Sequence, residues 1–167
     1  DAFFYSNGSS GGTTIDAGLK FESSNQRLEL WTADAERLSI DASGNVGLGL
    51  TYQADYYAKD LVVSAAAEGG ITIVGGSSNS NYLMFADGTS GTSQYRGYLQ
   101  YNHSTDTLIM ATAGNAMFNL SYAETVINDQ GFDHDFRVES DTNTHALFVE
   151  GSSGNVAIGL DNPSDYY

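Results

Sequence analysis

GLKFESSNQRLEL, the sequence of residues 18–30, sets the expected fold class of this chain. Apolar and charged residues alternate at 19–22 and again at 27–30, which is the period of a strand with one apolar face. The polar run 23–26 between these segments is typical of a tight turn. The stretch therefore predicts two antiparallel strands joined by a short loop.

The hairpin stretch recurs when the sequence is displaced by 80 positions, because residues 4–40 then align with 84–120 without a gap. Apolar residues fall mostly on apolar residues, as Leu19 does on Leu99. Internal repetition of this kind is typical of repeat architectures. We therefore predict that the two stretches adopt the same fold and stack along one axis.

A second self-match has a displacement of 110 and pairs SGNVGLGL at 43–50 with SGNVAIGL at 153–160. The two matches predict four segments: a hairpin-rich module at 1–40, a Gly-rich connector at 41–80, a second hairpin-rich module at 81–120 and a second connector at 121–167. We expect the chain to be a piece of a longer protein, since neither Asp1 nor Tyr167 looks like a natural terminus.

Short apolar runs predict further strands along the chain. They are expected at 2–6, 36–41, 45–49, 60–64, 70–74, 82–86, 116–121, 135–139, 146–150 and 155–159. Asp87-Gly88 is a local reversal signal, and the Ala-rich stretch 54–68 could instead form one or two helical turns. The predicted fold class is all-β, built from elongated repeat modules of short antiparallel strands.

Composition limits how this chain can be stabilised and what it can bind. Apolar residues make up 41% and are split by turn residues, so partner chains could supply burial that one chain lacks. The net charge of −15 disfavours nucleic acid and anionic membranes. No apolar stretch approaches the roughly 18 residues of a membrane span, so we expect no membrane insertion. With no cysteine, disulfides and thiolate metal sites are excluded.

Two segments carry a resemblance to a known class of proteins. SGNVGLG at 43–49 resembles a recurrent motif of phage tail fibres, and DFRVESDTNTHALFV at 135–149 resembles a segment of fibre-like proteins from marine and cyanobacterial phages. The resemblance covers roughly 36–64 and 132–162. The sequence departs from the common pattern at Leu50 and Leu160, where Thr or Ser followed by Pro is frequent.

The resemblance implies a structural segment of a tail fibre or spike, located in the virion and extracellular. It implies an intertwined homotrimeric β-fibre that spaces and supports host-receptor attachment. The implied partners are two further copies of the chain, other virion tail proteins and host surface glycans. Val46, Leu48, Val156 and Ile158 would point toward the trimer axis, with Gly47 and Gly49 relieving crowding outward or at crossings.

The sequence offers little chemistry, and we expect no catalytic, cofactor or metal site. Asp133-His134-Asp135 could supply metal ligands, although such triplets are common in acidic loops. Carboxylates such as Glu29 and Glu36 fit exposed strand positions. The best candidates for receptor contact are Tyr95, Arg96 and Tyr98. Other aromatic residues, Trp31 and Tyr52 among them, could stack on sugar rings if exposed, or could serve packing.

Three alternative interpretations stay open at this point. The chain could belong to an enzyme, a tailspike that degrades host polysaccharide with paired carboxylates. It could come from a non-phage extracellular adhesin or filament built from the same modules. It could also be an ordinary monomeric β-sandwich with Gly-rich turns.

Overall fold

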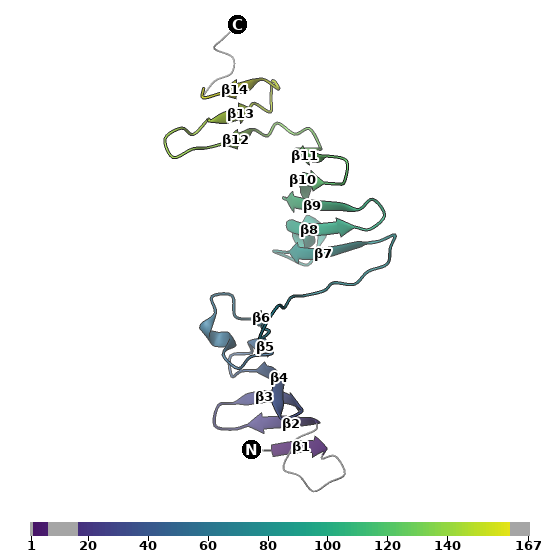
Figure 1. Cartoon of the computed structure of the whole chain (residues 1–167), viewed down its shortest axis with the longest axis vertical. Helices are drawn as coiled ribbons and strands as arrows, with labels where there is room; N and C mark the ends of the chain where they lie inside the picture. Colours follow the sequence, from purple (N-terminus) through teal and green to yellow (C-terminus); the bar gives the residue numbers. More distant parts are fainter. Residues whose placement is uncertain (1, 7–16, 161–167) are drawn as a thin grey trace. The chain divides into compact units, whose positions relative to one another are not determined.

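The computed structural model describes residues 2–6 and 17–160, and over these residues the chain is all-β, with no α-helix (Figure 1). The chain divides into two units, one ending at Thr72 and the other starting at Ile73. The first unit holds a six-stranded sheet, and the second holds a five-stranded and a three-stranded sheet. The predicted fold class is confirmed at this level.

The first sheet follows the chain strand by strand. Its strands are β1 (Ala2–Ser6), β2 (Ala17–Glu22), β3 (Arg27–Thr32), β4 (Ala35–Ile40), β5 (Val46–Leu48) and β6 (Leu61–Val63). Neighbours are antiparallel except β5 and β6, which are parallel and are connected through the short 3-10 helix η1 (Gln53–Asp55). The β3–β4 turn holds Ala33 and Asp34 at φ of 48° and 57°, the left-handed backbone that two-residue hairpin turns require.

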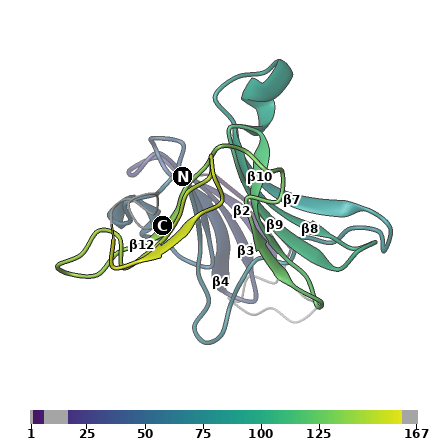
Figure 2. The ribbon, with the colours of Figure 1, turned by 90° about the horizontal axis from the view of Figure 1, so that it is seen from above.

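The second sheet is likewise an antiparallel meander. Its strands are β7 (Ser80–Phe85), β8 (Gly97–Asn102), β9 (Thr107–Thr112), β10 (Asn115–Leu120) and β11 (Thr125–Ile127), in that spatial order. The 3-10 helix η2 (Gly91–Tyr95) lies in the loop between β7 and β8. Figure 2 shows the strands of this sheet turned progressively against one another, which is the normal twist of a β-sheet.

The third sheet is the smallest. It consists of β12 (Phe136–Val138), β13 (Leu147–Val149) and β14 (Val156–Ile158), all antiparallel. Strands β5 and β14 coincide under the displacement of 110, and Gly49 and Gly159 share a positive φ of 76° and 74°. The two copies of the connector motif therefore form the same local structure.

The hairpin modules repeat with the same strand boundaries. Adding 80 to the bounds of β2, β3 and β4 gives those of β8, β9 and β10. In both modules the strand pairing skips one residue in the third of these strands, which is Arg37 in β4 and Met117 in β10. The prediction of a shared fold is confirmed for 17–40 and 97–120. Stacking of the modules along one axis stays a prediction.

Several local predictions were wrong. Residues 70–74 form no strand, since Gly69-Gly70 and Gly75-Gly76 flank the run and glycine weakens strands. Strand β11 was missed because three residues are too few to show a period of two. The chain does reverse after Asp87-Gly88, between the antiparallel strands β7 and β8, but through a longer loop that includes η2. In the stretch 54–68, β6 confirms the strand expected at 60–64, and the end of η1 is the helical part.

Burial in the described residues is unusual for a folded chain. The buried apolar side chains are only Phe148 and Ala157, both in the third sheet. The buried polar residues are more numerous, namely Glu29, Ser39, Asn45 and Gln53. Globular domains bury apolar layers against one another, but in the described part of each unit the sheets keep most of their large apolar side chains at least partly exposed.

Candidate interaction surfaces and sites

One face of the first sheet carries two rows of apolar side chains aligned across the strands. Backbone pairing places Phe21, Leu28, Ile40, Val46 and Leu61 in one row, and Leu19, Leu30, Leu38, Leu48 and Val63 in the other. We call this surface the first ladder face. None of these side chains is buried, and Leu30 is 43% exposed. Cross-strand apolar rows stabilise a sheet most when something covers them.

The second sheet presents an equivalent surface, the second ladder face. Its rows are Leu83, Leu99, Met110, Phe118 and Ile127, and Tyr101, Leu108 and Leu120. Leu99, Met110 and Phe118 are the counterparts of Leu19, Leu30 and Leu38 under the displacement of 80. The repeat thus preserves this apolar face in both modules.

The third sheet has a smaller exposed apolar face. It consists of Phe136, Val149 and Val156, and of Val138, Leu147 and Ile158. Ile158 is 78% exposed. The four residues expected to point toward a trimer axis, Val46, Leu48, Val156 and Ile158, all lie on these apolar faces. Their orientation toward a trimer axis stays a prediction.

The opposite face of the first sheet is polar and well covered. Glu29 is only 2% exposed, and its carboxylate accepts a hydrogen bond of 2.8 Å from Trp31 Nε1. Lys20 and Arg27 lie 3.5 and 3.7 Å from the same carboxylate. The expectation that Glu29 is exposed was wrong, because Lys20 on the adjacent strand β2 and Arg27 on the same strand β3 fold over it. Opposite charges across strands were the signal available in the sequence.

Glu36 belongs to the same cluster. Arg27 Nη2 donates to its carboxylate at 2.9 Å. Burial nevertheless raises the pKa of Glu36, outweighing the lowering by Ser39 and by Arg27. The side chain is 8% exposed, so the expectation of an exposed position was wrong for Glu36 as well. The cluster is a compact network of ion pairs rather than an open acid pair, and within it Arg27 Nε is buried without a hydrogen-bond partner.

Gln53 was not singled out from the sequence, yet it is the most buried long side chain among the described residues, at 1% exposure. Its Nε2 donates to the Asn45 carbonyl at 3.2 Å, and Ser39 Oγ donates to its Oε1 at 3.4 Å. Asp41 fixes the preceding turn by accepting bonds from Asn45 N and Nδ2 at 2.9 and 2.8 Å. These contacts lock the connector against the sheet.

The predicted receptor contacts Tyr95, Arg96 and Tyr98 do not form one aromatic platform. Tyr95 ends η2, in a loop that projects from the second sheet (Figure 2), and its ring lies beside Gly114. Arg96 Nε forms an exposed ion pair of 3.3 Å with Asp87. Tyr98 instead packs edge-on against Tyr82, with ring centroids 6.0 Å apart. A receptor role for the three residues stays a prediction.

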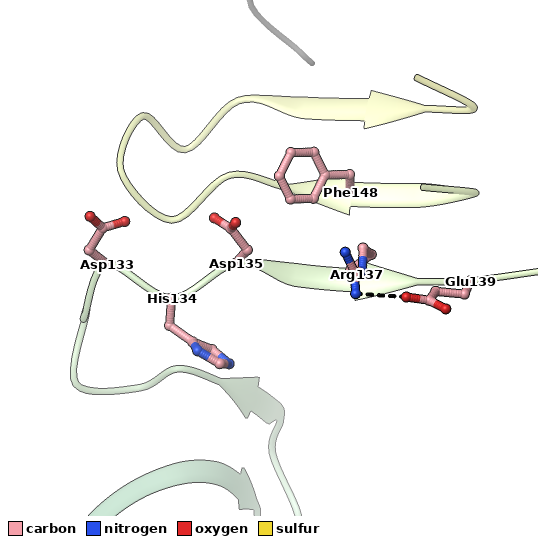
Figure 3. A pocket seen from close by; sticks show the side chains of 6 residues that line it. All are labelled: Asp133, His134, Asp135, Arg137, Glu139 and Phe148. Atoms are coloured by element: carbon pink, nitrogen blue, oxygen red, sulfur yellow. Dashed lines mark ion pairs between the residues drawn. The ribbon is translucent and has the colours of Figure 1, made fainter. Parts of the chain in front are cut away.

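A hollow of about 620 Å³ lies beside β12 and includes Asp133, His134 and Asp135. Figure 3 shows the two aspartates on one side of the loop and His134 on the other. Asp135 accepts a bond of 2.9 Å from Gly151 N, and Glu139 pairs with Arg137 at 2.7 Å. Across 17–160, no three His, Asp or Glu side chains gather closely enough to hold a metal ion.

Comparisons with known proteins give no relative. No family model, no curated protein and no solved structure matches this chain. Among the described residues, no helix is long and apolar enough to cross a membrane. Function must therefore be inferred from the surfaces above.

Proposed function

We propose that this chain is a structural segment of a phage tail fibre or spike, and that it works as a parallel homotrimer. The proposal is carried by one observation: rows of large apolar side chains lie at least partly exposed on the ladder faces, while the buried side chains of the described residues are mostly polar. Contiguous exposed apolar surface on a folded chain marks a site of association. Burial against other copies would add part of the roughly 1.5–3 kcal/mol that a fully exposed apolar side chain gains on burial, because the ladder side chains are already partly covered in one chain.

A trimer is compatible with one apolar and one polar face on the first sheet. Around a three-fold axis, the three ladder faces would enclose an apolar core, and the face with Glu29 and Gln53 would point outward. Two copies could also cover each other as a sandwich, so the preference for three rests on the resemblance at 43–49 and 135–149. Pairing between chains would also protect open strand edges such as β6.

Light scattering on the purified chain tests the assembly. We expect a mass three times the 17.8 kDa of one chain, stable on dilution to micromolar concentration. A stable monomer would overturn the trimer, and a stable dimer would favour the sandwich. The role as a spacer is tested in the parent fibre. Deleting one 80-residue period should shorten the fibre and leave adsorption to host cells largely intact.

The other functional classes have their own tests. A polysaccharide-degrading tailspike would release new reducing ends from host polysaccharide, and a single carboxylate substitution would abolish the release. A receptor contact at Tyr95 or Tyr98 would show as lost adsorption after Tyr95→Ala or Tyr98→Ala in a fibre that is still trimeric. An extracellular adhesin from another source would share the assembly but would lack neighbouring virion genes.

A further inference from the structure

A second hollow, of about 490 Å³, lies in the first unit between the β3–β4 turn and the segment that follows β5. Its lining includes Trp31, Asp34, Glu36, Leu50, Thr51 and Tyr52. Trp31 is on the polar face of the sheet, since its indole bonds to Glu29 two residues away. We propose that this hollow binds a neutral or amino-substituted oligosaccharide.

Both walls of the hollow are fixed before any ligand arrives. On one wall, the Trp31 indole is held at 2.8 Å by Glu29, and Glu36 is held at 2.9 Å by Arg27. On the other, the chain turns at Gly49 and is then anchored by the buried amide of Gln53. A preorganised site loses less conformational entropy when it binds.

The side chains in the hollow suit a sugar. Trp31 is half-buried and Tyr52 is 71% exposed, so aromatic rings are available to the apolar faces of a pyranose. The exposed residue Asp34 adds a carboxylate whose oxygens can accept hydrogen bonds from sugar hydroxyl groups. Because Asp34 and Glu36 both carry carboxylates in a chain of net charge −15, sulfated or sialylated glycans are disfavoured. An amino group would be attracted instead.

The second module lacks these groups, although it keeps the scaffold. Ala111, Ala116 and Gly114 stand at the positions that correspond to Trp31, Glu36 and Asp34. The ladder residues stay apolar in both copies, as Leu19 and Leu99 do. A spacer needs only the shared ladders, so the hollow is a specific addition to the first module.

The inference rests on the proposed host-attachment role for its biological meaning, and it adds a binding site to the spacer. The site itself lies within one chain and on the face opposite the ladders. It can therefore bind whether or not the chain forms a trimer, and the two proposals can fail separately.

Trp31 is the single tryptophan of the chain, so its fluorescence reports on this hollow alone. We would titrate the whole chain with N-acetylchitotriose, maltotriose, a glucosamine trimer and a sulfated heparin disaccharide. The first three include two neutral sugars and one amino sugar. At least one of these three should shift the Trp31 emission at millimolar concentration or below, and the sulfated disaccharide should not.

Two variants identify the ring that makes the contact. Tyr52→Ala should weaken binding by about tenfold, a change of about 1.4 kcal/mol. The control Tyr57→Ala removes a fully exposed ring outside the hollow and should change affinity less than about twofold. Circular dichroism and light scattering on the same samples report folding and mass.

The outcomes separate cleanly. A trimer that binds none of the three sugars, or whose affinity survives Tyr52→Ala, overturns the site and leaves the assembly intact. Equal binding of the sulfated disaccharide overturns the proposed ligand class. A folded monomer that binds a neutral or amino sugar through Tyr52 supports the site and overturns the trimer.

Discussion

Gln53 covers Gly47 so closely that a Cβ added at residue 47 would lie 2.8 Å from Gln53 Oε1. The same added atom would lie 2.8 Å from the Leu50 carbonyl oxygen and 3.1 Å from Ser39 Oγ. The glycine of the connector motif is therefore required by contacts within one chain. In the second copy the counterparts are Ala157 and Pro163, so the glutamine and the glycine are absent together.

The contact between Gly47 and Gln53 leads to a prediction that a double variant can test. Gly47→Ala should lower the free energy of unfolding by about 1–3 kcal/mol, because the methyl group is forced against packed atoms. Gln53→Ala should cost a similar amount, because it leaves buried polar partners unsatisfied. The double variant should lose less than the sum, by about 1 kcal/mol. Denaturant melts at one fixed chain concentration measure all three. Simple additivity would contradict the contact.

Gly151 gives a second prediction about close backbone approach. A Cβ at this position would lie 2.4 Å from the backbone nitrogen of His134. Backbone cannot rotate away as a side chain can, so Gly151→Ala should destabilise the third sheet by about 1–3 kcal/mol or more. Faster amide hydrogen exchange in β13 would report the effect. Gly70→Ala is the matched control, since a Cβ there meets nothing within 4 Å.

The stability of the folded chain should depend on pH through the carboxylate of Asp41. The Asn45 side-chain amide, followed by the backbone amides of Asn45 and Ser43, holds the pKa of Asp41 below its usual range. The folded chain thus favours the ionised carboxylate of Asp41. The stabilisation of the fold by Asp41 is therefore present above about pH 4 and is lost as pH falls through the lowered pKa.

Asp41→Asn should be less stable than the parent chain at pH 7 by about 1 kcal/mol. The difference should shrink on acidification. Glu36 has a raised pKa, so its contribution to stability changes with pH in the opposite direction. Because Glu36 is present in both proteins, the difference between their melting curves isolates Asp41. A gap that stays constant down to about pH 2 would contradict the assignment.

The features that could be predicted from the sequence are the strands in which apolar and polar residues alternate with a period of two. Strands β2, β3, β8 and β9 and the repeat of 80 follow from alternating residues whose partners are local. Contacts between distant polar groups could not be predicted in this way. The burial of Glu29 depends on Lys20 of strand β2 and Arg27 of its own strand covering it, and that of Gln53 depends on where the chain turns after β5.

The same limit applies to the candidate sites. Tyr95 and Tyr98 are three residues apart in sequence, but the strand start at Gly97 gives their rings different neighbours. Trp31 and Tyr52 are far apart in sequence and line the same hollow, because the chain passes through β4 and β5 between them. Aromatic composition alone could not distinguish these two arrangements.

The last prediction concerns the ladder faces. Leu30 lies in the middle of the first ladder face and is paired with Leu19 and Leu38. In one isolated chain Leu30→Glu should be tolerated, since the side chain is 43% exposed. In an assembly that buries the ladder, three buried carboxylates would face one another, at a cost of several kcal/mol per ion. The control Val74→Glu changes a residue that is 87% exposed and outside any strand. Light scattering should therefore show dissociation for Leu30→Glu and an intact trimer for Val74→Glu, and a trimer that survives Leu30→Glu would place the ladder face outside the interface.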